Sequence, residues 1–257
     1  MIGRAAMNDE QDFIGEIIES STTEFTAESR ELYYPPAFGS FVKVELRLPE
    51  TLIGIPPIAQ QVIAETEDDP FAETAFRQSA GGFGREYDRA MNGEVVADSS
   101  GVPSLTIYAV VHNATTGAPD STRLPRAYWK DEERLREEQP EISEWMLVTR
   151  FQAMIVAHAS NGSIRQFLPP MPPKIHGGVL PCTADEICKL TARMDFLRTV
   201  VNFADAPTEE VVAACIREAH YARGGDFQFL VSAGKELAGL LKDDYDRLQA
   251  IMRRVSV

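Results

Sequence analysis

The sequence predicts an α+β protein in which a small β-barrel with a long insertion precedes a helical unit. Strand-like segments with alternating apolar residues dominate the first two thirds, and the apolar period changes to that of helices in the last third. A stretch rich in proline, glycine and acidic residues interrupts the strands. We therefore expect a disordered leader over 1–11, a barrel over 12–180 with an insertion at about 49–103, and a helical domain over 181–257.

The first three strands are predicted near the N-terminus. Phe13–Glu19 places isoleucines among glutamates, and Thr23–Ala27 is rich in β-forming residues around a phenylalanine. In Phe41–Leu46 the alternation is complete, which is typical of a half-buried barrel strand. The two faces of this segment are Val42, Val44 and Leu46 on one side and Lys43 and Glu45 on the other.

Further strands are predicted after the insertion. Ser104–His112 is apolar along most of its length, whereas Asn113–Tyr128 contains glycine and proline and is expected to be a loop. A β-rich segment over Met146–His158 leads into the Asn-Gly pair of Ser160–Ser163, which favours a hairpin turn. Return and closing strands are expected at Ile164–Leu168 and Ile175–Leu180.

Helices are predicted in a charged segment between two strands and throughout the last third. Lys130–Gln139 is that charged helical segment, and a second short helix is expected near Ser143. Thr183–Glu186 matches a capping box, and the apolar spacing after it predicts one helix continuing to Val201. Three more helices are expected at about 208–223, 227–241 and 245–255, so the unit would hold three or four in all.

Composition narrows the class of protein. No apolar run approaches the roughly 20 residues of a membrane-spanning helix, and residues 1–11 lack the apolar stretch of a secretory signal, so we expect a cytoplasmic protein. Three cysteines, Cys182, Cys188 and Cys215, are an odd number and favour reduced thiols. The net charge of −14 argues against direct binding of nucleic acid.

Two glycine-containing stretches resemble phosphate-binding loops without completing the motif. Gly81–Gly84 is not preceded by a strand or followed by a helix, and the last glycine position of the G-x-G-x-x-G dinucleotide fingerprint is not filled. Ser232–Glu236 is similar to the end of a P-loop, but Phe229 stands at the first glycine position and Glu236 replaces the hydroxyl that would bind magnesium. We expect a flexible loop at the first site, a helix at the second, and no cofactor.

Histidines and cysteines offer the next candidates for chemistry. His176, Cys182 and Cys188 could be metal ligands, but their spacing is wider than that of structural zinc pairs, so packing cysteines are favoured and no metal is expected. His112 and His158 lie at apparent strand ends and could, with His176, line an acid–base site. No nucleophile motif accompanies them, so we expect no catalytic residue.

Two other features bear on binding. Phe167–Lys174 fits the P-x-x-P pattern of polyproline ligands, although a stiff connector between strands is the favoured interpretation. The acidic runs at Glu65–Glu73 and Asp131–Glu144 are expected to be solvated faces, and Trp129 and Trp145 flank the second run, as aromatic residues at interfaces often do.

The N-terminal strand motifs resemble a HAS barrel, the β-barrel shared by HerA-type helicases and the N-terminal regions of ATP synthase head subunits. The motifs are Ile14–Ile17, Thr22–Phe25 and Gly39–Val44. Over most of 12–257 the chain is similar to a bacterial family, abundant in cyanobacteria, in which such a barrel stands without the ATPase domain. The further matching stretches are Tyr108–Gly117, Leu168–His176, Pro181–Cys182 leading into Asp195–Leu197, Gly234–Ala238 and Leu248–Arg254.

The resemblance implies an assembly surface and no motor activity, since the ATPase domain is absent. We therefore expect a non-catalytic interaction module that self-associates or docks on a protein partner, using the barrel face and the acidic loops. An adaptor of a HerA-like ATPase in nucleic-acid processing is the first alternative. An enzyme with a site lined by His112, His158 and His176 is the second.

Overall fold

The structure, a computed structural model, describes residues 13–47, 104–120, 125, 127–139, 146–160 and 162–255. The predicted leader and insertion, with Gly81–Gly84 and the acidic run Glu65–Glu73, lie outside the described residues, as does the helix expected near Ser143. By their contacts the residues divide into two units, and the first contains Met1–Leu46, Thr106–Ala159 and Ile164–Val257. Apart from the strand ends Arg47, Ser104–Leu105, Ser160 and Ser163, the strands and helices discussed below belong to this first unit.

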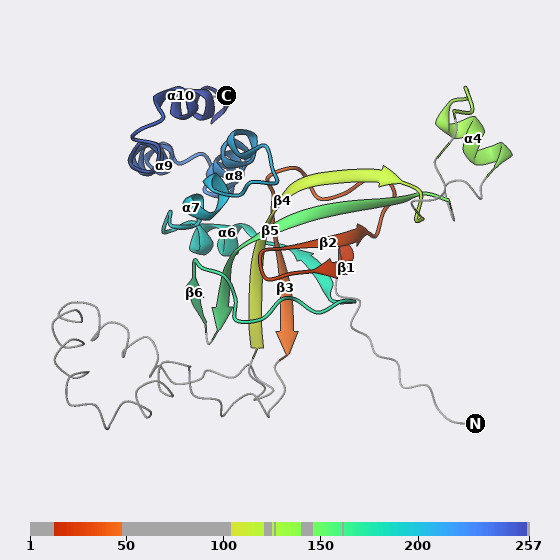
Figure 1. Cartoon of the computed structure of the whole chain (residues 1–257), viewed down its shortest axis with the longest axis horizontal. Coiled ribbons are helices and arrows are strands. Elements are labelled where there is room, and N and C mark those ends of the chain that lie inside the picture. Colours follow the sequence, from red (N-terminus) through yellow and green to blue (C-terminus); the bar gives the residue numbers. More distant parts are fainter. Residues whose placement is uncertain are drawn as a thin grey trace. The chain divides into compact units, whose positions relative to one another are not determined.

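The described strands form a closed β-barrel, which confirms the predicted α+β class (Figure 1). They follow the order β2-β1-β7-β3-β4-β5-β6, and an additional pairing of β2 with β5 closes the ring, leaving β6 attached outside it. Every pairing for which a register is given is antiparallel. The strands are β1 (Gly15–Ser20), β2 (Glu24–Ser29), β3 (Phe41–Arg47), β4 (Ser104–Gly117), β5 (Val148–Ser160), β6 (Ser163–Arg165) and β7 (Gly178–Pro181).

Alternation along the strands divides the barrel into an apolar inside and a mixed outside. In β3, Val42, Val44 and Leu46 are buried while Glu45 is exposed, as predicted. The same period places Phe25 and Ala27 of β2 inside and their neighbours outside. The inward residues that are fully or almost fully buried include Ile17, Phe25, Ala27, Val42, Val44, Ile107, Ala109, Val111, Phe151, Ala153, Ile155 and Val179.

Helices α6–α10 pack against part of the outer barrel surface. Outward residues of β3, β4 and β5 belong to the same hydrophobic cluster as the helices, among them Phe41, Tyr108 and Val156. The Phe41 ring meets the edge of Phe196 with 5.9 Å between centroids. The described helices are α4 (Glu132–Glu138), α6 (Ala184–Leu190), α7 (Phe196–Val201), α8 (Thr208–Ala222), α9 (Phe227–Leu240) and α10 (Tyr245–Val255).

The capping box at the start of α6 is confirmed, but the prediction of one helix reaching Val201 is wrong. Thr183 accepts a hydrogen bond from the Glu186 backbone, and the Glu186 carboxylate accepts one from the Thr183 backbone. The helix ends at Leu190, and α7 starts at Phe196, so residues 184–255 hold five described helices instead of three or four.

Gln166 gives the physical reason for this break. Its side-chain amide donates to the carbonyls of Leu190 (2.5 Å) and Arg193 (2.9 Å), and its carbonyl accepts from the Phe196 backbone N–H (2.8 Å). These backbone groups lie at the end of α6 and the start of α7, where a helix leaves its own donors and acceptors unpaired. The side chain of Gln166, distant in sequence, therefore satisfies the backbone groups that are left unpaired between α6 and α7.

Several strand boundaries also differ from the predictions. The prediction of a loop over Asn113–Tyr128 is wrong for its first residues, because β4 continues to Gly117. The return strand β6 is shorter than predicted, and the closing strand β7 begins only at Gly178. In the hairpin turn Gly162 has the expected positive φ of 75°, while Asn161 lies outside the described residues.

Candidate functional site: a polar face on the barrel wall

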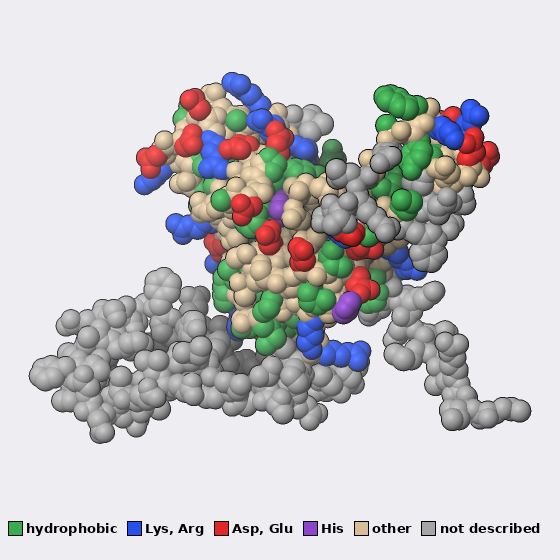
Figure 2. All heavy atoms as spheres, turned by 45° about the vertical axis from the view of Figure 1, so that its right-hand side comes forward, with side chains coloured by type: hydrophobic (Ala, Val, Ile, Leu, Met, Phe, Trp, Pro, Cys, Tyr) green, Lys and Arg blue, Asp and Glu red, His purple; other side chains and the backbone are tan. Residues whose placement is uncertain are grey.

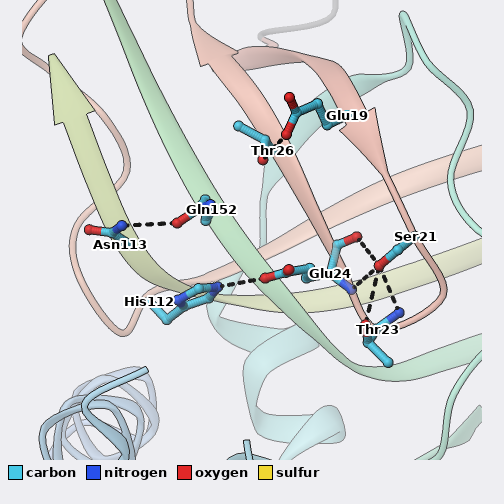
Figure 3. A network of polar contacts seen from close by, with 8 residues as sticks. All are labelled: Glu19, Ser21, Thr23, Glu24, Thr26, His112, Asn113 and Gln152. Carbon is cyan, nitrogen blue, oxygen red and sulfur yellow. Dashed lines mark hydrogen bonds and ion pairs between the residues drawn. The ribbon is translucent and has the colours of Figure 1, made fainter. Parts of the chain in front are cut away.

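Eight polar residues lie together on the outer surface of the barrel, where β1, β2, β5 and the end of β4 run side by side (Figure 3). In β2, Glu24 and Thr26 point outward because Phe25 and Ala27, which alternate with them along the strand, point inward. We call this set the polar face. Its members are Glu19, Ser21, Thr23, Glu24, Thr26, His112, Asn113 and Gln152.

One row of the polar face crosses four strands. Glu19 of β1 is paired with Thr26 of β2, and Thr26 is paired with Gln152 of β5. The Thr26 hydroxyl donates to Glu19 Oε2 (3.2 Å), and Asn113 Nδ2 of β4 donates to Gln152 Oε1 (2.9 Å). The side chains are therefore ordered by neighbours on the adjacent strands, with Glu19 and Asn113 exposed and Thr26 and Gln152 half-buried.

The turn between β1 and β2 fixes the position of Glu24. Ser21 Oγ accepts hydrogen bonds from the backbone N–H groups of Thr23 (3.2 Å) and Glu24 (3.0 Å), and it donates to the Glu24 carbonyl (2.9 Å). Serine commonly stabilises turns by such local bonds to the backbone. The Glu24 carboxylate consequently projects from the first residue of β2 toward His112 (Figure 3).

His112 lies beneath Glu24 at the margin of the helical layer. The side chain is only 2% exposed, its Nε2 is 3.4 Å from Glu24 Oε2, and neither ring nitrogen has a hydrogen-bond partner. Its ring lies 5.1 Å from that of Phe203, in the connection between α7 and α8. Burial lowers the pKa of His112, and the nearby carboxylates of Glu24 and Asp205 oppose this shift only in part. At neutral pH the imidazole is uncharged and leaves the charge of Glu24 uncompensated.

The two carboxylates of the polar face lack a basic partner among the described residues, unlike several other carboxylates there. Lys43 pairs with Glu186 (2.7 Å), Arg247 with Glu209 (2.6 Å), and Arg254 with Glu210. Among the described residues no lysine or arginine pairs with Glu19 or Glu24. Figure 2 shows acidic side chains over the middle of the surface drawn there, with basic side chains mainly toward its margins.

A hollow of about 560 Å³ lies at the other end of β1 and β2. Its lining includes the pair of Glu16 and His176, in which His176 Nδ1 donates to Glu16 Oε1 (2.6 Å). Arg30 also lines the hollow and brings a positive charge. The complete lining is Phe13, Gly15, Glu16, Ile18, Glu28, Ser29, Arg30, His176 and Gly178.

The structure places the three candidate histidines in separate surroundings. His112 faces Glu24 and Phe203, whereas the buried His158 donates through Nδ1 to the Phe167 carbonyl (3.1 Å). Burial lowers the pKa of His158 as well, against the effect of this hydrogen bond. His176 is exposed in the hollow. No two of them share a partner among the contacts of the described residues, so they are not brought together as a common site.

The cysteines are packed as small apolar side chains. Burial raises the pKa of Cys182 to about 12, and burial also raises that of Cys215, so both thiols are protonated at neutral pH. Cys188 Sγ lies 3.5 Å from the Ala222 carbonyl, between α6 and α8. Within the described residues no group of three or more histidine, cysteine, aspartate or glutamate side chains could hold a metal ion.

The remaining sequence candidates are structural or remote from the polar face. Ser232–Glu236 lies within α9, as predicted. In the connector Phe167–Lys174, Pro169 and Pro173 are buried, and Ser20 Oγ donates to the Pro173 carbonyl (2.6 Å). The acidic run Asp131–Glu144 is described only to Gln139, where Trp129 beside it is 93% exposed, while Trp145 lies outside the described residues.

The polar face is not predictable from local sequence patterns. Glu19, Thr26 and Gln152 are separated by up to 133 residues and become neighbours only through the pairings β1–β2 and β2–β5. Asn113 falls in a segment predicted to be a loop, although it belongs to β4. The available signal is the alternation in Glu24–Ser29, which assigns Glu24 and Thr26 to the outside of the barrel.

Comparison with known proteins gives no relative: no protein-family model matches the chain, and no curated protein is significantly similar to it. Among the described helices, none has the length and apolar character needed to cross a membrane. The candidate function therefore rests on the geometry of the barrel and its polar face.

Proposed function

We propose that this chain is a non-catalytic docking module whose polar face binds a protein partner. The observation that carries the proposal is the position of this face. Helices α6–α10 pack on the outside of β3, β4 and the later part of β5, and within the described part of the chain they leave the row from Glu19 to Asn113 uncovered. An ordered polar row on a rigid sheet provides fixed hydrogen-bonding groups for a partner.

The separation of the histidines supports a binding role over a catalytic one. General acid–base catalysis needs groups within hydrogen-bond reach of one reacting atom. His112 is almost fully buried, and His158 uses a ring nitrogen to hold a backbone carbonyl. Neither ring is therefore placed to reach a reacting atom.

Charge favours a different protein over a second copy of the chain. A two-fold symmetric contact through the polar face would place the Glu19 and Glu24 carboxylates of one copy near those of the other. Like charges in contact destabilise an interface, and the chain already carries a net charge of −14. The same charge disfavours a nucleic-acid phosphate backbone as the bound surface.

The resemblance to the HAS barrel supports the same proposal, because barrels of that family act as assembly surfaces. Within it, an adaptor of a HerA-like ATPase is the more specific form. We place the module in the cytoplasm, a reducing compartment that suits its three free cysteines. If the chain is an adaptor of a HerA-like ATPase, the bound partner should belong to a motor or nuclease complex.

The test is site-specific photo-crosslinking in a native lysate. A photoreactive residue at Thr26 is expected to give a discrete adduct, and the same residue at Ser232, exposed on α9, serves as the control. Unlabelled wild-type protein should compete for the adduct, whereas a Thr26→Trp competitor should not. Equal adducts from both positions, or none from Thr26, would overturn the proposal, and light scattering would then show whether the protein self-associates.

A further inference from the structure

We propose that the polar face recognises a lysine- or arginine-containing extended segment of the partner, with separate cationic side chains paired to Glu19 and to Glu24. This inference rests on the proposed docking function and adds the chemistry of the bound segment.

The first step is the charge state of the face. Glu19 accepts its hydrogen bond from a neutral hydroxyl, that of Thr26 (3.2 Å). Glu24 has a buried imidazole as its nearest partner, at 3.4 Å. None of the eight residues that define the polar face is a lysine or arginine. Asp205, whose charge acts on His112 from the helical side, adds to the negative potential.

The second step concerns the buried side of Glu24. His112 is 2% exposed, and its Nε2 lies 3.4 Å from Glu24 Oε2, the contact drawn as a dashed line in Figure 3. This contact does not have the geometry of a hydrogen bond, and Nδ1 has no hydrogen-bond partner either. A buried polar group of this kind is an exception that calls for an explanation. Glu24 itself is 36% exposed, so one side of the carboxylate meets the imidazole and the other is open to solvent. A cation can therefore reach the carboxylate from its solvent side, opposite His112.

The third step is the cost of covering the face. A partner that excludes water here removes two carboxylates from solvent, and burying an unpaired charge is strongly unfavourable. A neutral or acidic partner leaves this cost uncompensated. A lysine or arginine offsets it with charge-assisted hydrogen bonds, which are the stronger class of hydrogen bond. Covering this face therefore selects for a basic partner.

The length of the row suggests how the segment lies. The row from Glu19 to Asn113 spans four neighbouring strands, hence three spacings of about 4.8 Å or ~14 Å in total. An extended chain covers this distance in about four residues. The amides of Gln152 and Asn113 then offer donors and acceptors to the uncharged part of the segment.

The opposite end of the same two strands is less suited to a cation. Arg30 lines the hollow beside Glu28, and Arg150 is paired across the sheet with Glu28. The Arg150 guanidinium donates to the Pro119 carbonyl (2.8 Å), and it still adds positive charge to that end. The two glutamates nearest the β1–β2 turn are therefore the favoured contact.

The experiment is an NMR titration of the full chain with the peptide acetyl-Lys-Thr-Lys-Thr-Lys-Thr-amide. A peptide with glutamine in place of lysine serves as the ligand control. Amide shifts are expected to concentrate at residues 19–26 and around Gln152, and the glutamine peptide should cause at least tenfold smaller shifts at equal concentration.

Charge variants test which carboxylates are responsible. The double substitution Glu19→Gln and Glu24→Gln should weaken binding of the lysine peptide about fivefold, which corresponds to about 1 kcal/mol. A charge-matched control, Glu236→Gln with Asp243→Asn, removes two exposed carboxylates elsewhere and should leave the affinity within twofold.

The outcomes separate this inference from the docking function. Shifts spread evenly over all acidic surfaces, or equal weakening by both double variants, would overturn recognition of a basic segment. If crosslinking from Thr26 still captured one competed partner, docking would stand and the partner's chemistry would be different. If Thr26 captured nothing specific, the docking function itself would fail, whatever the peptide did.

Discussion

Substituting Gly39 by alanine should strongly destabilise the protein, because this glycine lies where the loop after β2 meets helix α8. Gly39 has a φ of +82°, and its backbone N–H donates to the Val111 carbonyl of β4 (2.8 Å). A Cβ atom added at this position would lie 2.2 Å from the Cβ of Ala214 in α8. Both the backbone conformation and the packing therefore require glycine.

The magnitude follows from these two terms. An L-residue in the left-handed region costs ~1–2 kcal/mol. Overpacking by one methyl group costs about 1–3 kcal/mol, since real Cβ contacts never approach 2.2 Å and one element must move. Gly39→Ala should therefore lower the free energy of unfolding by roughly 2–5 kcal/mol.

A double-mutant cycle isolates the steric part. Ala214→Gly alone should cost about 1–2 kcal/mol, from the lower helix propensity of glycine and the loss of a buried methyl group. In the double variant the Cβ–Cβ overlap disappears, while the strain at positive φ and the close approach to the Ala214 backbone (3.0 and 3.1 Å) remain. The two losses should therefore fall short of additivity by about 1–3 kcal/mol. Urea unfolding followed by far-UV circular dichroism at 25 °C measures each variant.

Two results would refute this reasoning. A loss below about 1 kcal/mol for Gly39→Ala would mean that the loop moves away from α8 without cost. Strict additivity in the cycle would mean that Ala214 does not limit the space at Gly39.

Three further predictions concern the helical layer and its junction with the barrel. Gln166→Ala removes all three hydrogen bonds that join α6 to α7. It should lower the free energy of unfolding, measured in urea, by ~2–3 kcal/mol. The control Gln228→Ala, at an exposed position on α9, should lower it by less than about 0.5 kcal/mol. Thr183→Ala removes the capping box and should cost about 1 kcal/mol, while an unchanged stability would show that the cap contributes nothing. Because the folded pKa of His112 is lowered below its ordinary 6.5, the unfolded chain binds more protons, and the free energy of unfolding should fall as the pH drops below ~6.5. His112→Phe should make this fall smaller between pH 7.5 and 5.5, and an identical pH profile would contradict the assignment.

Local sequence signals predict much of the fold correctly. The alternation of Val42, Val44 and Leu46 determines which side of β3 is buried, because successive side chains of a strand point to opposite faces. The capping box of Thr183 and Glu186 marks the first residue of α6 through contacts only three residues apart. The limits of α8, α9 and α10 likewise fall within two residues of the predicted ones.

Long-range contacts decide the features that local signals miss. The apolar spacing after Ile187 continues through Met194 to Val201, yet the chain breaks between α6 and α7, where Gln166 satisfies the open backbone groups. Asn113 lies in a predicted loop, but pairing with the neighbouring strand extends β4 past it.

Local sequence patterns are sufficient to predict the class of the fold, the burial pattern of the strands and the starts of most helices, since each depends on residues close together in the chain. The row of Glu19, Thr26, Gln152 and Asn113, and the burial of His112 under Glu24, arise from strand pairing between distant segments. Closure of the barrel through β2 and β5 brings together strands more than a hundred residues apart. The register of that pairing, which places Thr26 opposite Gln152, is what creates the polar face.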